Sequence, residues 1–372
     1  KQMPLIVNEL QRRGLKFPVL VGGAAINRRF SWRILFTEDG LPYEPGVFYC
    51  KDAFEGLSVM DSLTSVEKKP ALYEKMLREA EYELNQVQKN DGVVNSKETR
   101  SKVARAEFIP KPPHWGPKLV KSMPLDAVFH HLAINELYRL SWGAKNTHGA
   151  AWKKLKAEYD TRLDDMRRDA LNDPWLFPQG MYGYWPAQST LTELIIFDTV
   201  SYLEGSLREL TRLCFPRQEA EEHLSLADYF SPVESGVMDV VALQVVTVGL
   251  KATEIFDQLQ SQNRYTEAYF THGLAVQMAE ATADYLHQHI RRELGLQPEQ
   301  GKRYSWGYPA IPELSDHRKV FNLLPVEAEL GMQLSPAYQL IPEQSTAAII
   351  VHHPAAKYFN IGESRIDQLT RS

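Results

Sequence analysis

Cysteine is scarce in this chain, which has only Cys50 and Cys214 among its 372 residues. Two cysteines cannot build a disulfide framework. They also lack the paired spacing of a zinc site made from four cysteines, or from two cysteines and two histidines. Low cysteine use is typical of a reducing compartment, so we expect a cytoplasmic protein.

Long apolar runs and an excess of positive charge are also missing. No apolar run reaches the roughly 18 residues of a membrane-spanning helix, so we expect no membrane span. The formal net charge is −5, which implies no strongly basic face for nucleic acid. Residues 1–18 lack the apolar core of a signal peptide and start without Met in a helical pattern, so we interpret the chain as a piece of a longer polypeptide.

The first 65 residues predict the last part of an open α/β sheet. An apolar run before Gly22 and Gly23 is typical of a buried parallel strand that ends in a tight turn. Ligands on such sheets bind at the carboxyl ends of the strands, where Gly22, Gly23 and Ala53 are expected. The expected elements are a helix at 3–13, strands at 17–21 and 46–50, and a helix beginning near Asp52.

The charged stretch that follows predicts a linker over residues 66–110 with one long helix, and a Pro-rich segment then opens a second domain at 111–372. Helices and strands do not alternate regularly in this second domain. That favours a mixed α+β fold with an antiparallel sheet and long helices, after the Rossmann-like or flavodoxin-like α/β segment at 1–65. We expect helices at 124–140, 148–171, 202–213 and 263–294, strands at 191–198, 237–249 and 346–354, and a Gly-, Pro- and aromatic-rich loop at 178–189.

The segment RYSWGYPAIPEL, residues 303–314, combines three aromatic residues, two prolines and one Arg. Its prolines exclude a helix and disfavour a central strand. Arg303 is suited to binding a carboxylate through two hydrogen bonds, and the backbone around Gly307 is open to a ligand. The aromatic pair Tyr358-Phe359 could stack on a base or face a sulfonium cation. These groups suit a nucleoside that carries an amino acid, such as S-adenosylmethionine, although a purely structural aromatic turn remains open.

The helix at 263–294 carries four polar residues on one face, because Glu280, Asp284, His287 and Arg291 stand at i, i+4, i+7 and i+11. This stripe is either a solvated, salt-bridged face or the wall of a cleft. The pair His352-His353 lies on an expected strand, where neighbours point to opposite faces. We therefore expect a hydrogen-bonded core residue there rather than a metal site.

Taken together, these motifs resemble the C-terminal part of cobalamin-dependent methionine synthase. RYSWGYPAIPEL is similar to that family's Arg-x-x-x-Gly-Tyr-Pro-Ala-x-Pro motif, which lies in a reactivation domain that binds S-adenosylmethionine. ADYLHQHIRRE resembles its long helix, HHPAAKYF its last motif, and PVLVGGAA with VFYCKDA the last strand ends of its cobalamin-binding domain. The resemblance covers nearly the whole chain.

The resemblance implies a set of site residues. Arg303 would bind the methionyl carboxylate of S-adenosylmethionine, Tyr358 and Phe359 its nucleoside, and Glu280 would help to hold the ligand. Tyr308 would also lie near the corrin when two domains close. The ligand's amino group would meet Asn135 or Glu136, where the match to the family's Asp is imperfect. The further residues that it implies are Gly307, Pro309 and Ala310 for S-adenosylmethionine, and Gly22, Gly23 and Ala53 for cobalamin.

The resemblance also implies an activity. Methionine synthase transfers a methyl group from 5-methyltetrahydrofolate to homocysteine, and this region would reactivate oxidised cob(II)alamin by reductive methylation. Its partners would be a flavodoxin-like or other reductase and the remaining homocysteine, folate and cobalamin-cap modules. We expect a monomer, with cobalamin in its methylcobalamin form and S-adenosylmethionine as cofactors.

One part of the family pattern is absent. The motif with the cobalt-ligating His, Asp-x-His-x-x-Gly, does not occur in these residues, so no metal ligand is expected in this chain. Two alternatives stay open, namely a non-catalytic regulatory module that binds S-adenosylmethionine, and a hydrolase that uses Glu280, Asp284 and His287.

Overall fold

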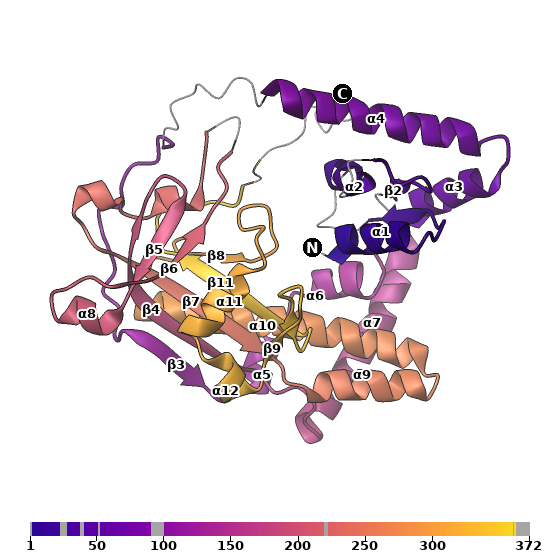
Figure 1. The fold of residues 1–372 in the computed structure, drawn as a ribbon. Helices are drawn as coiled ribbons and strands as arrows, with labels where there is room; N and C mark the ends of the chain where they lie inside the picture. The colour runs from indigo at the N-terminus through magenta and orange to yellow at the C-terminus, as the bar shows by residue number, and fades with distance from the viewer. Residues whose placement is uncertain are drawn as a thin grey trace. The chain divides into compact units, whose positions relative to one another are not determined.

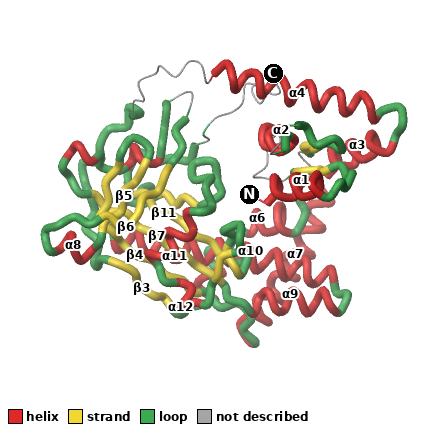
Figure 2. Tube along the Cα trace, in the orientation of Figure 1, coloured by secondary structure: helices red, strands yellow, loops and turns green. Residues whose placement is uncertain are grey.

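The structure is a computed structural model that describes residues 2–22, 28–37, 41–50, 53–90, 100–218, 222–359 and 361. The chain divides into two compact units, residues 1–99 and residues 100–372. Figure 1 shows the elements along the chain, and Figure 2 shows that residues 1–99 are mainly helical whereas residues 100–372 combine a sheet with helices.

The first unit contains a parallel pair of short strands with helices around it, as expected for the end of an open α/β sheet. Val19 pairs with Val47, and Val21 pairs with Tyr49. A Cβ at Gly22 would lie 2.3 Å from the carbonyl oxygen of Cys50, so only glycine fits where the two strands end. The elements are α1 (Gln2–Arg12), β1 (Val19–Val21), α2 (Arg28–Leu35), β2 (Val47–Tyr49), α3 (Ala53–Thr64) and α4 (Lys69–Asn90).

The second unit is built on an antiparallel sheet in the order β6-β5-β4-β7-β11-β8, with β3 also paired to β4. This confirms the mixed α+β prediction. The strands are β3 (Gly116–Val120), β4 (Gln179–Ser189), β5 (Glu193–Phe197), β6 (Glu209–Cys214), β7 (Asp239–Thr247), β8 (Lys302–Ser305) and β11 (Ser345–Val351), with a separate hairpin of β9 (Gln333–Leu334) and β10 (Leu340–Ile341). Strand β8 ends the order, so the strand that carries Arg303 is an edge strand.

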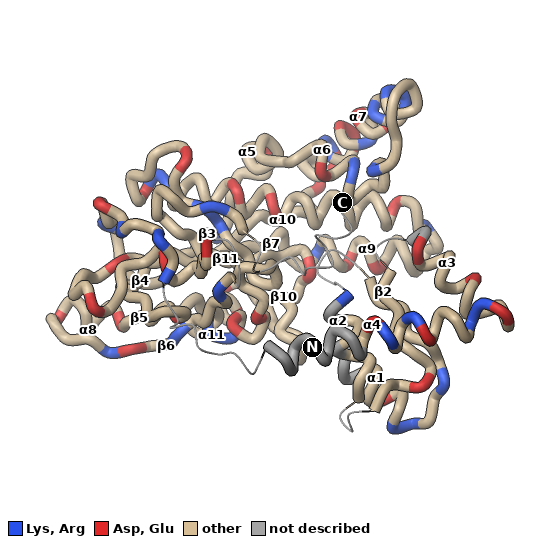
Figure 3. Tube along the Cα trace, turned by 90° about the horizontal axis from the view of Figure 1, so that it is seen from above, with Lys and Arg blue, Asp and Glu red and all other residues tan. Residues whose placement is uncertain are grey.

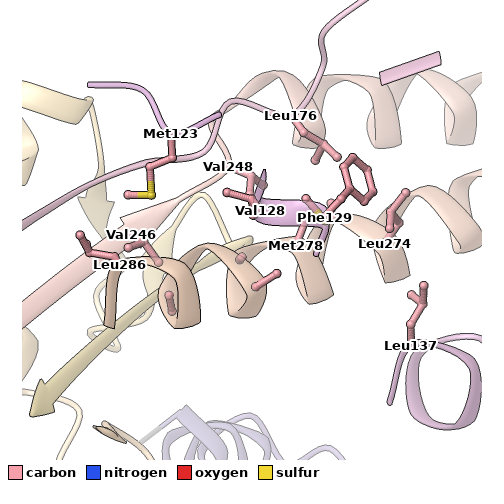
Figure 4. Close-up of a cluster of buried hydrophobic side chains, with 14 of the residues drawn as sticks. Met123, Val128, Phe129, Leu137, Leu176, Val246, Val248, Leu274, Met278 and Leu286 are labelled. Atoms are coloured by element: carbon pink, nitrogen blue, oxygen red, sulfur yellow. The ribbon is translucent and has the colours of Figure 1, made fainter. Parts of the chain in front are cut away.

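A long helix, α10 (Tyr265–Glu293), packs across β7 and β11. Its apolar side chains Leu274, Met278 and Leu286 enter one of the two cores, together with Val246 and the other side chains of Figure 4. The second core lies on the opposite face of the sheet. The other helices are α5 (Leu125–Phe129), α6 (Ile134–Glu136), a π-helix (Leu137–Ser141), α7 (Gly149–Asn172), α8 (Thr199–Leu203), α9 (Lys251–Ser261), α11 (Asp316–Leu323), α12 (Val326–Leu330), and 3-10 turns at Leu226–Tyr229 and Val233–Ser235.

The loop expected at 178–189 is wrong, because these residues form β4, the longest strand of the sheet. Proline is rare in central strands, because it cannot donate a backbone hydrogen bond to a neighbouring strand. On one side β4 pairs with β7 along its length. On the other side β3 pairs with residues 180–184 and β5 with residues 187–189, so Pro186 falls between these two partners.

The helix expected at 202–213 is also wrong. Helix α8 ends at Leu203, and Gly205 has a φ of 79°, a left-handed conformation that ends helices. The chain then forms β6, which pairs with β5 and buries Leu213. The helix expected at 124–140 is instead broken into α5, α6 and the π-helix, whereas the helices at 148–171 and 263–294 are confirmed by α7 and α10.

A buried contact between a histidine and an aspartate joins the end of β11 to the start of β7. His352 Nε2 lies 2.6 Å from Asp239 Oδ1, and the two side chains are 3% and 1% exposed. The backbone N–H groups of Ser231 and Val240 also donate to the Asp239 carboxylate. His353 is buried as well and contacts the carbonyl of Ala104 at 2.9 Å, so the hydrogen-bonded core expected for this histidine pair is confirmed.

We expect Asp239→Asn to lower the free energy of unfolding by about 1.5–3 kcal/mol at neutral pH, because the buried groups around residue 239 lose hydrogen bonds to a charged acceptor. Unfolding in urea can be followed by tryptophan fluorescence, since six of the seven tryptophans lie beyond residue 100. Glu327→Gln removes a surface partner of Arg318 and should cost less than about 1 kcal/mol.

The same pair sets a dependence on pH. Burial alone would raise the pKa of Asp239, but His352 and the two backbone N–H groups bring that pKa below its usual value. A carboxyl with a lowered folded pKa adds stability above its unfolded pKa of about 4, and this contribution is lost as the pH falls further. Wild type should therefore lose more stability than Asp239→Asn between about pH 5 and pH 2. Parallel curves for the two proteins would contradict this assignment.

Candidate functional site

Strand β8 directs Arg303 toward α10. Arg303 pairs with Ile350 of β11, a member of the core beneath α10, so the two side chains share a face of the sheet. Its guanidinium Nη2 donates to Glu280 Oε2 of α10 at 2.7 Å. The Arg303 side chain is 18% exposed and that of Glu280 is 42% exposed. The sequence prediction that both residues belong to one site is consistent with this contact.

The second terminal nitrogen of Arg303 has unused hydrogen-bonding capacity. Arg303 Nη1 is buried and has no hydrogen-bond partner among the described residues. A buried N–H without a partner costs about 1–3 kcal/mol, and more when the group is charged. Such a cost is removed when a ligand oxygen or a water accepts the hydrogen bond. A carboxylate is the acceptor that matches a guanidinium best.

The segment after β8 forms a tight loop. Gly307, with a φ of 90°, donates its N–H to the carbonyl of Ile311 at 2.8 Å, and Ile311 donates to the carbonyl of Tyr308 at 2.9 Å. Trp306 and Ala310 are buried and anchor the loop to the core on the opposite face of the sheet. The loop therefore presents Tyr308, 66% exposed, on a fixed backbone.

Two carboxylates act on Tyr308. Partial burial of its hydroxyl, followed by the charges of Glu280 and Glu136, raises the pKa of Tyr308, while the positive charge of Arg303 opposes the shift. This holds although Tyr308 as a whole residue is 66% exposed. The charges of Glu280, Glu136 and Arg303 therefore all act on the hydroxyl of Tyr308. Asn135 and Glu136 are both exposed and lie in α6, and the charge of Glu136 contributes to the raised pKa of Tyr308.

The aromatic pair Tyr358-Phe359 lies on the face of β8 that is opposite to Arg303. The ring of Tyr358 lies 5.3 Å from that of Tyr304, which pairs with Ile349 and points away from Arg303. Phe359 packs against the core that contains Tyr304. Tyr304 is not among the site residues that the sequence predicts. The alternation of side chains along a strand is the signal that could have shown its ring and Arg303 on opposite faces.

The other polar residues of the α10 stripe form hydrogen bonds with other parts of the protein. Asp284 binds His131 Nδ1 at 2.7 Å, and His287 Nε2 lies 2.7 Å from the carbonyl oxygen of Gly301. Burial lowers the pKa of His287 to about 4. Arg291 donates to the carbonyl of Gln297 at 2.8 Å. No two of the hydrolase candidates Glu280, Asp284 and His287 are paired as an acid and a base.

The residues expected to contact cobalamin belong to the first unit. Gly22 follows β1 and Ala53 begins α3, which follows β2, so both lie at the carboxyl ends of the parallel pair. Gly23 lies outside the described residues. In the parts of the chain that the structure describes, no three His, Cys, Asp or Glu side chains are grouped to hold a metal ion, and no helix is both long and apolar enough to cross a membrane.

Solved structures include one similar to this chain, the crystal structure of the MetH reactivation domain bound to AdoHcy. It superimposes with a TM-score of 0.60 at 23% identity, over 71% of this chain and 87% of that one. At this level of identity the likeness concerns the fold. It agrees with the antiparallel sheet and helices of residues 100–372.

Two proteins are more similar to this chain in sequence than that structure is. Proteins named methionine synthase from Mycobacterium tuberculosis (strain ATCC 25618 / H37Rv) and Mycobacterium leprae (strain TN) are each 31% identical to this chain over 95% of its length. The chain spans about a third of the length of these relatives, 33% of each. The family model described as "Vitamin B12 dependent methionine synthase, activation domain" matches residues 118–371. The chain therefore belongs to the family of vitamin B12-dependent methionine synthase activation domains.

Proposed function

We propose that this chain binds S-adenosylmethionine and uses it to reactivate cobalamin within a methionine synthase. The observation that carries the proposal is Arg303, whose guanidinium is held by Glu280 while Nη1 is buried without a partner among the described residues. Membership of the activation-domain family supports the same function. The complete reaction, from 5-methyltetrahydrofolate to homocysteine, is proposed for the whole enzyme of which this chain resembles about a third.

The division of labour follows from the chemistry of the ligand. The methionyl carboxylate would accept hydrogen bonds from Arg303. Glu136 is better suited than Asn135 to the ammonium group, because a carboxylate attracts a cation and an amide carries no charge. Gly307, Pro309 and Ala310 would shape the floor beside Tyr308, on a loop that is already closed by hydrogen bonds and loses little entropy on binding. Tyr358 and Phe359 would contact the nucleoside around the free edge of β8.

Cobalamin, when bound, supplies the nucleophile that accepts the methyl group. The residues of this chain would hold the methyl donor in place, which is a proximity effect that requires no general acid or base. Asp284 and His287 are hydrogen-bonded to His131 and to the carbonyl of Gly301, which agrees with a reaction that uses neither as an acid or a base. Gly22, Gly23 and Ala53 would contact the cofactor, and exposed Tyr308 would face the corrin.

The partners of this reaction are proposed on the same basis. The homocysteine, folate and cobalamin-cap modules would belong to the rest of the enzyme, since the curated relatives are about three times as long as the part that this chain matches. The electron needed for reductive methylation would come from a flavodoxin-like protein or another reductase.

We expect Arg303→Ala to weaken binding of S-adenosylmethionine by at least 30-fold, because removal of one half of a hydrogen-bonded charge pair costs about 2–5 kcal/mol. Titration calorimetry of wild type and variant measures this. Arg212→Ala is the matched control, because Arg212 lies on β6 at the opposite edge of the sheet and pairs with Glu209 at the surface, so the affinity should not change. Absence of binding by the wild type at millimolar ligand would rule out the proposed function.

A second measurement separates an enzyme from a regulatory module. In the full-length enzyme that contains this chain, Arg303→Ala should abolish the return of cob(II)alamin to methylcobalamin with S-adenosylmethionine and a reductant. Turnover that starts from methylated cofactor should persist, because methyl transfer from 5-methyltetrahydrofolate to homocysteine does not require S-adenosylmethionine, the ligand that Arg303 would bind. Visible absorbance of the corrin and formation of S-adenosylhomocysteine report the two results. If the wild type binds S-adenosylmethionine without transferring methyl to cobalamin, the regulatory alternative is correct.

A further inference from the structure

The charge of Arg303 is already balanced before a ligand binds. Glu280 Oε2 lies 2.7 Å from Arg303 Nη2, so the guanidinium and one carboxylate form a neutral pair. A ligand carboxylate added to this pair brings an excess negative charge. That excess is repelled unless the ligand also carries cations of its own.

The contacts of α10 with residues 131–141 predict where a second carboxylate, that of Glu136, lies relative to this pair. His131 binds Asp284 at 2.7 Å, and Ser141 accepts a hydrogen bond from Gln277 at 3.1 Å. These two contacts fix the segment 131–141 against α10 with the opposite chain direction. Glu136 lies midway between the two anchors, and Glu280 lies between Gln277 and Asp284. The two glutamates are therefore expected at the same height along α10.

The influence of both glutamates on Tyr308 agrees with this placement. Acidic and basic positions are otherwise interspersed along the trace (Figure 3). The excess of acid at the site thus comes from particular side chains and is not a property of a strongly acidic unit. Arg303, Glu280 and Glu136 together carry one net negative charge.

We infer that Glu280 and Glu136 make the site selective for the sulfonium form of the ligand, so that S-adenosylmethionine binds more tightly than S-adenosylhomocysteine. This inference rests on the proposed function. S-adenosylmethionine carries one net positive charge, from a carboxylate, an ammonium group and a sulfonium. S-adenosylhomocysteine has a neutral thioether in place of the sulfonium and carries no net charge.

This selectivity would favour release of the product after the methyl group has been transferred. The charges of Arg303, Glu280, Glu136 and S-adenosylmethionine add up to zero, whereas the same three side chains with S-adenosylhomocysteine keep one negative charge. Transfer of the methyl group removes the sulfonium charge from the ligand. The product is then held less firmly than the substrate, which favours its release and its replacement by a new methyl donor.

The ratio of two affinities tests this inference. Calorimetry gives the affinity for S-adenosylmethionine divided by that for S-adenosylhomocysteine in wild type, Glu280→Gln and Glu136→Gln. We expect each substitution to lower this ratio about 1.5-fold to fivefold, the range of partly exposed charge interactions. The two ligands differ only in the methyl group and the sulfonium charge. A general change in affinity, such as one caused by freeing Arg303 from Glu280, therefore cancels in the ratio.

Glu267→Gln is the matched control, because Glu267 lies on the same helix about 20 Å from Glu280 and pairs with Arg264 at the surface. That distance exceeds the Debye length of about 8 Å, so the ratio should not change. A wild type that binds both ligands equally, or a ratio that survives both site substitutions, overturns the inference and leaves the proposed function intact. A wild type that binds neither ligand overturns both.

Discussion

The arrangement of the candidate site depends on the packing of α10 across the antiparallel sheet. Apolar side chains of this helix enter the core above β7 and β11, and this contact fixes the height and rotation of its polar stripe. Because the helix is buried along one side, Glu280 is placed over the edge strand β8. The ion pair with Arg303 is thus a consequence of core packing.

The edge position of β8 has a second consequence. A strand inside the sheet would have both backbone edges paired, whereas β8 is bonded only to β11 among the described strands. Arg303 and Tyr304 project to opposite faces of the same edge. One ligand can reach both faces only by passing around the edge, so an edge strand suits a ligand with two chemically different ends. In the proposed site, Arg303 would bind the carboxylate end and Tyr358 would contact the nucleoside end.

Much of the site was predictable from local sequence. Proline and glycine positions indicated a loop after Arg303, and the spacing of Glu280, Asp284, His287 and Arg291 placed them on one helix face. Periodicity could not show which member of that stripe pairs with Arg303 and which contact other parts of the chain. Three of them contact His131, Gly301 and Gln297, which are distant in sequence or lie beyond the end of the helix.

The sequence by itself determined the class of fold, the long helices and the chemical character of the loop at 303–314, because these follow from side-chain period, proline and glycine. Only the tertiary structure decided that 178–189 is a strand, since Pro186 is tolerated in the gap between β3 and β5. It also decided the partner of Arg303 and the opposite facing of Tyr304, because pairing between strands and helix packing depend on residues far apart in the chain. Local preferences are overruled wherever such non-local contacts bury more surface or satisfy more hydrogen bonds.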